Sequence, residues 1–161
     1  MEQPERKRRA IELFRQAYQE QCDRNLDDAV RLYKASLAYY PTAEAHTFLG
    51  WTYSFQDRID DAIEECKKAI EVDPTFGNPY NDIGSYLIRL GRVEEAIPWL
   101  ERATQAERYD ARHYPHCNLG RVYWSKGQLL KAMAEFEKAL ALEPGYTYAA
   151  ESLAKIREQL N

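Results

Sequence analysis

The chain lacks long apolar runs, paired cysteines and an excess of basic charge. No apolar stretch approaches the ~20 residues that a helix needs to cross a bilayer, so we expect no membrane-spanning segment. The net charge of −4 gives no overall attraction to phosphate backbones, which disfavours nucleic acid as a partner. The basic run from Arg6 to Arg9 is not followed by the apolar segment of a secretory signal, so we expect a cytoplasmic location.

Motifs that carry catalysis or hold cofactors are also absent. The chain has no Gly-rich phosphate loop, no Gly-x-Ser-x-Gly elbow and no His-Glu-x-x-His pair. Only His113, His116 and Cys117 bring metal-ligand residue types close together, and Pro115 separates the two histidines at an expected helix start. We therefore expect no enzymatic activity, no cofactor and no metal.

What the chain does contain is a repeat. Three segments share one pattern: Leu49-Gly50-x-x-Tyr53, Ile83-Gly84-x-x-Leu87 and Leu119-Gly120-x-x-Tyr123. An alanine follows each glycine twelve residues later, and an earlier unit fits the same frame with Ala17 and Ala29. The four alanines, Ala29, Ala62, Ala96 and Ala132, follow at steps of 33, 34 and 36 residues. A period of this length is typical of solenoid proteins.

Each unit contains two stretches with apolar residues at helical spacing. Asp57, Gly91 and Gly127 lie between the stretches, where glycine ends a helix in the left-handed conformation more easily than aspartate. Pro41, Pro74 and Pro144 follow the second stretch of three units, where proline cannot continue a helix. Every unit is therefore expected to form a helix-turn-helix.

These features resemble the tetratricopeptide repeat family, whose pattern is also followed by Phe136, Ala139 and Pro144 in the last unit. The resemblance covers almost the whole chain. It implies an all-α, right-handed helical solenoid that forms a single domain, residues 1–161. The four repeats are expected at about 10–42, 43–76, 77–112 and 113–146, with a C-terminal capping helix at about 147–160.

One junction departs from the pattern. Arg108 stands where the other units have their closing proline, and about two extra residues appear near Asp110 to Arg112. We expect a longer helix or a bulged connection between the third and fourth units.

The first helices carry side chains that the repeat core does not need. Trp51 and Phe55 lie off the stripe that contains Leu49 and Tyr53. In tetratricopeptide repeat proteins the first helices line a concave groove, so the resemblance implies that such positions face a ligand. The expected groove residues are Phe14, Tyr18, Trp51, Phe55, Asn81, Ser85, Arg89, Asn118, Arg121 and Trp124.

This set changes character along the chain, from aromatic in the first two units to polar and cationic in the last two. The expected ligand is a protein or peptide segment with apolar anchors at one end and an acidic group at the other. Asn81 and Asn118 are candidates to hold its backbone, and Arg89 and Arg121 to bind its carboxylates. In the alternative interpretation, the aromatic residues only fill space between adjacent first helices.

Two further points bear on the partner. Repeats that resemble the chaperone-binding carboxylate clamp need Lys and Asn in the first unit and basic residues in the third. Those positions are occupied here by Phe14, Tyr18, Asn78 and Asp82, so the clamp is absent and a partner with the acidic chaperone tail is disfavoured. The function expected is that of a non-enzymatic adaptor. A self-assembling scaffold subunit, which would form a homo-oligomer, and a single-stranded RNA-binding repeat protein are the alternatives.

Overall fold

The computed structural model describes residues 1–161 and contains nine α-helices and no β-sheet. None of the helices is both long enough and apolar enough to span a membrane. The helices are α1 (Gln3–Cys22), α2 (Leu26–Tyr39), α3 (Ala43–Phe55), α4 (Ile59–Val72), α5 (Asn78–Arg89), α6 (Val93–Gln105), α7 (His113–Ser125), α8 (Leu129–Leu142) and α9 (Thr147–Leu160).

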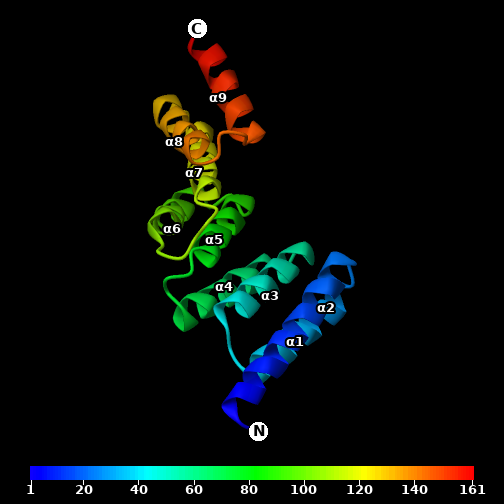
Figure 1. Ribbon diagram of the computed structural model, residues 1–161. Helices are drawn as coiled ribbons and strands as arrows, with labels where there is room; N and C mark the ends of the chain where they lie inside the picture. Colours follow the sequence, from blue (N-terminus) through cyan, green and yellow to red (C-terminus); the bar gives the residue numbers. More distant parts are fainter.

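The helices pack in consecutive antiparallel pairs, α1 with α2, α3 with α4, α5 with α6 and α7 with α8. Each pair contacts the next, and α9 packs on α8. Figure 1 shows the pairs following one another from the N-terminus at the bottom to the C-terminus at the top. The predicted all-α repeat solenoid is confirmed.

The turn inside each pair uses one residue in the left-handed conformation. Gly91 and Gly127 have φ of 77° and 72°, and Asp57 has φ of 59° at the expected position. Arg24, with φ of 64°, does the same in the first pair, where the sequence gives no glycine signal. The four pairs thus share one turn geometry, although only two of them have glycine, which adopts the left-handed conformation without strain.

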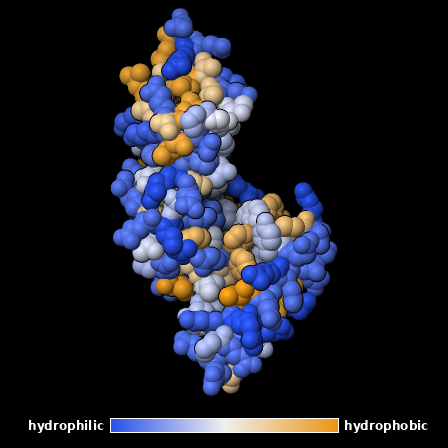
Figure 2. Space-filling view, in the orientation of Figure 1, coloured by the Kyte–Doolittle hydropathy of each residue, from blue (hydrophilic) through white to orange (hydrophobic).

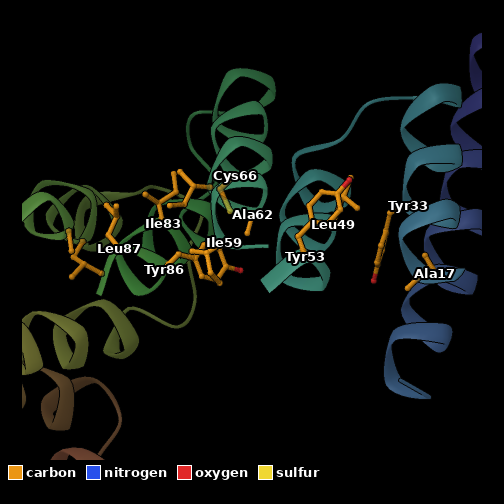
Figure 3. Close-up of a cluster of buried hydrophobic side chains, with 14 of the residues drawn as sticks. Ala17, Tyr33, Leu49, Tyr53, Ile59, Ala62, Cys66, Ile83, Tyr86 and Leu87 are labelled. Carbon is orange, nitrogen blue, oxygen red and sulfur yellow. The ribbon is translucent and has the colours of Figure 1, made fainter. Parts of the chain in front are cut away.

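The pairs close over a small residue on the first helix. A methyl group on Gly50 would lie 2.9 Å from the carbonyl oxygen of Ala62, and one on Gly120 would lie 2.8 Å from the ring of Phe136. Leu100 covers Gly84 in the same way. Ala62 and its repeat equivalents are fully buried, but the side chain one turn later fills the space over the glycine. Figure 3 shows the resulting core, which runs through several pairs.

The connection between α6 and α7 is the bulged one that the sequence predicts. It spans residues 106–112, and Arg108 exchanges backbone hydrogen bonds with the α4–α5 connection, to Thr75 O at 3.0 Å and from Gly77 N at 3.1 Å. The Arg108 guanidinium also lies 2.8 Å from both Glu44 and Asp73. Arg108 therefore ties the connection after the third pair to the second pair, while α6 itself is not extended.

The last helix covers the open end of the solenoid. Ala149, Leu153 and Ile156 of α9 are buried against Phe136 and Ala139 of α8. In this position α9 caps the core of the final pair, as the sequence predicts.

The helix approach at Gly50 can be tested by adding one methyl group. We expect Gly50→Ala to lower the free energy of unfolding by about 1–3 kcal/mol, because the new Cβ meets backbone that cannot move aside. Gly145→Ala is the matched control, since nothing lies within 4 Å of a Cβ at that position. Urea denaturation followed by circular dichroism measures both. An unchanged Gly50→Ala variant would contradict the packing described.

Candidate functional site

The first helices form one continuous face. α1 contacts α3, α3 contacts α5, and α5 contacts α7. The sides of these four helices that face away from their paired second helices therefore form one surface along the solenoid. Figure 2 shows the molecule hollowed on its right side, with pale and tan residues gathered over the region of α3. Most of the residues expected to line a groove lie on this face.

Five aromatic side chains interlock along α1 and α3. We call them the aromatic row: Phe14, Tyr18, Phe48, Trp51 and Phe55. Phe48 is central, because its ring centroid lies 5.3 Å from Phe14, 5.7 Å from Tyr18 and 5.9 Å from Trp51. Trp51 continues the row to Phe55 at 5.1 Å. The three contacts of Phe48 within the row are edge to face and the Trp51–Phe55 contact is tilted, and together they favour a defined orientation for each ring.

The row is only partly buried. Phe14 and Phe48 are the half-buried members, and both pack against Tyr33 of α2. Tyr18, Trp51 and Phe55 remain 46%, 39% and 55% exposed. The two interpretations of the aromatics thus apply to different residues, since Phe14 fills space between helices and the other three present open ring surface.

Sequence reasoning missed Phe48. It precedes Leu49 and lies off the core stripe, but its repeat equivalents Asp82 and Asn118 are polar, so comparing the units gives no sign of an aromatic contact position. An apolar residue outside the helical stripe was the available signal.

A cavity adjoins the row at its N-terminal end. This N-terminal pocket has a volume of about 520 Å³ and lies between α1, the end of α2 and the start of α3. Its lining is mostly apolar, with Ala10, Ile11 and Phe14 on one side and Tyr40 on the other. Ile11 is 50% exposed, so the pocket opens to solvent beside the aromatic row.

The polar residues of α5 and α7 form a chain of hydrogen bonds. Arg121 Nη1 donates to Asn118 Oδ1 at 3.0 Å, and Asn118 Nδ2 donates to Asn81 Oδ1 at 3.0 Å. Asn81 is buried, with only 8% of its surface exposed. The two side-chain amides are therefore hydrogen-bonded to each other and to Arg121, so they are not both free to hydrogen-bond a peptide backbone.

The remaining expected residues are spread more widely. Arg89 turns back toward the end of α3, where it lies 3.6 Å from Asp57. Trp124 packs on Phe136, and its indole N–H donates to Gln159 of α9 at 3.2 Å. Ser85 is half-buried on α5. The structure thus brings Arg121 to the open face with its charge free, whereas Arg89 is paired and Trp124 is engaged by the capping helix.

A second aromatic cavity lies at the far end of the face. We call it the tyrosine pocket; it has a volume of about 260 Å³ and is lined by Tyr114, Cys117, Asn118, Arg121, Tyr146 and Tyr148. Sequence reasoning placed polar and cationic groups in this half, with Trp124 as the one aromatic residue. It missed the three tyrosines because two of them come from the start of the capping segment.

One carboxyl group on α5 has no partner. Asp82 is half-buried and forms no hydrogen bond or ion pair with the rest of the chain, and burial raises the pKa of its carboxyl from 3.8 to about 7. Asp82 occupies the repeat position of Phe48, which packs toward the preceding pair. A carboxylate there is destabilising for the fold.

The histidines form structural pairs. His46 Nδ1 lies 2.8 Å from Glu65, and His116 Nδ1 lies 2.7 Å from Glu135 at the same repeat position. Burial alone would raise the pKa of Glu65, but hydrogen bonds from His46 and Lys68 lower it below its usual range. These pairs join the first helix to the second within a repeat. No group of three or more metal-ligand side chains comes together in the structure.

Comparison with known proteins gives matches along most of the chain. Residues 43–76, 65–97 and 113–146 match family models described as tetratricopeptide repeat. The type IV pilus assembly protein PilF of Pseudomonas aeruginosa is 30% identical over 115 residues, which are 71% of this chain and 46% of PilF. The chain therefore spans about half the length of that curated relative.

Solved structures agree with the sequence matches. The structure of Pseudomonas aeruginosa PilF superposes with a TM-score of 0.89 at 25% identity, over 96% of this chain and 70% of that one. MamA superposes with a TM-score of 0.75 at 30% identity, over 89% of this chain and 83% of that one.

The unpartnered carboxyl of Asp82 makes stability depend on pH. Because its folded pKa is raised, the protonated form is favoured by folding, and stability is lost as the pH rises from about 4 through about 7. We expect Asp82→Asn to be more stable than the wild type above pH 7, by up to about 4 kcal/mol, and equal to it below pH 4. Urea denaturation across this range measures the difference. Asp110→Asn, which removes the same charge at an exposed position, is the control. A difference in the free energy of unfolding between Asp82→Asn and the wild type that does not vary with pH would contradict the assignment.

Proposed function

Because the chain belongs to the tetratricopeptide repeat family, we propose that it is a non-enzymatic interaction module that binds a protein segment along the face of α1, α3, α5 and α7. The aromatic row is the observation that carries this proposal. Three of its rings are about half exposed while their orientations are held by neighbouring rings. Rings held in this way lose little conformational freedom when a partner covers them, so they are effective anchors.

The chemistry of the face favours a segment with apolar anchors. The N-terminal pocket adjoins the aromatic row and offers about 520 Å³ of mostly apolar space, enough for bulky side chains of a partner. At the other end of the face Arg121 carries a positive charge that no carboxylate of the chain neutralises. A partner with apolar side chains toward α1 and an acidic group toward α7 suits both ends.

The similarity to a pilus assembly protein favours a partner within a multiprotein assembly.

A cytoplasmic location belongs to the same proposal, since the three cysteines are free thiols, two of them buried, as suits a reducing compartment. Fractionation of cells followed by immunoblotting checks the location.

The proposal can be tested by capture of partners from native lysate. We expect Trp51→Ala to lower the yield of specifically captured proteins at least tenfold, because truncation of a central aromatic anchor costs about 2 kcal/mol or more. Quantitative mass spectrometry compares the variant with the wild type, and circular dichroism checks that both are folded.

Leu130→Ala is the matched control for this experiment. It removes an apolar side chain that is 75% exposed, more than Trp51, but lies on α8 outside the proposed binding face. The proposal requires capture by this variant to equal that of the wild type. If Trp51→Ala captures the same proteins in the same amounts, the aromatic row is not the binding surface.

A further inference from the structure

The tyrosine pocket lies at the C-terminal end of the binding face, between α7 and the start of α9. Its aromatic walls come from two segments: Tyr114 on α7, and Tyr146 and Tyr148 around the first turn of α9. Because α9 packs on the final pair through its own buried face, the pocket is a fixed part of the fold.

The aromatic walls hold one another in place yet leave ring surface open. Tyr114 and Tyr146 meet edge to face with centroids 5.7 Å apart, and His113 lies 4.2 Å from Tyr114 and 5.0 Å from Tyr146. Tyr114 is nevertheless 45% exposed and Tyr148 is 42% exposed. Open ring faces and edges around a small cavity favour an aromatic ring as the guest.

The charge of the pocket is positive and comes from one residue. Arg121 is the only ionic side chain in the lining, and its hydrogen bond to Asn118 is supported by the buried Asn81 behind it. The Cys117 thiol stays neutral, since burial raises its pKa to about 12. A single guanidinium matches one carboxylate in a two-point contact, whereas a phosphate group would carry more charge than one arginine balances.

The ring site and the cation line the same cavity, so their ligands must lie close together in the partner. A cavity of about 260 Å³ has room for a single aromatic residue, and a residue that ends its chain bears ring and carboxylate together. We propose that the tyrosine pocket binds the carboxyl-terminal aromatic residue of the partner segment, with the ring among the tyrosines and the α-carboxylate on Arg121. This inference rests on the proposed function and assigns the direction of the segment along the face.

The minimal ligand is a direct probe. N-acetylphenylalanine and its primary amide are titrated separately into ¹⁵N-labelled protein, and backbone amide shifts are followed by NMR. We expect the acid to shift residues of α7 and of the first turn of α9, with an affinity at least fivefold higher than that of the amide. Equal affinities, shifts confined to the aromatic row, or no shifts with either compound up to 20 mM would overturn the proposal.

Two variants and a third compound separate the alternatives. Arg121→Gln should abolish the preference for the acid over the amide, whereas Arg8→Gln, an exposed arginine on α1, should keep it. Acetyl-Asp-Phe-amide carries its carboxylate on a side chain. If it binds as tightly as N-acetylphenylalanine, the pocket recognises internal acidic residues, and the assignment to a carboxyl-terminal residue is wrong.

Failure here is distinguishable from failure of the proposed function. If lysate partners depend on Trp51 but N-acetylphenylalanine does not bind, the aromatic row binds segments and the tyrosine pocket has no part in it. If the acid binds at α7 and α9 but no partner depends on Trp51, the binding face is limited to its C-terminal end.

Discussion

The close approach of two helices at a residue without a bulky side chain is the constraint on which the rest of the molecule depends. Gly50, Gly84 and Gly120 each lie under a side chain from the paired helix, and Ala17 holds the equivalent place in the first pair. The covering side chains differ in size, from Cys66 in one pair to Phe136 in another. Each pair therefore has its own packing, although the backbone arrangement is shared.

This arrangement also determines which surface is free. The first helix of a pair buries one side against the second helix of that pair and another side against the next pair. Its remaining side has no packing role. Side chains there are not needed for the fold, yet α3 carries Trp51 and Phe55 at such positions. Exposed aromatic surface of this kind on a rigid scaffold is typical of a binding site.

The sequence predicts the elements of this fold well and the contacts between repeats less well. Helices, turns and the bulge at Arg108 follow from local signals, because glycine, proline and apolar spacing act within a few residues. The meeting of Phe48 with Tyr33 depends instead on how one pair is rotated against the next. The same holds for Trp124, which α9 engages, and for the tyrosine pocket, whose walls come from two segments more than twenty residues apart.

The central claim is that a partner covers the face of the first helices. Photo-crosslinking in cells tests it most directly, with p-benzoylphenylalanine in place of Phe55 on α3 in one variant and of Leu130 on α8 in another. Both side chains are exposed, so neither substitution disturbs the core. The account predicts a discrete crosslinked product from position 55 and none from position 130. The opposite pattern, or equal crosslinking from both positions, would contradict it.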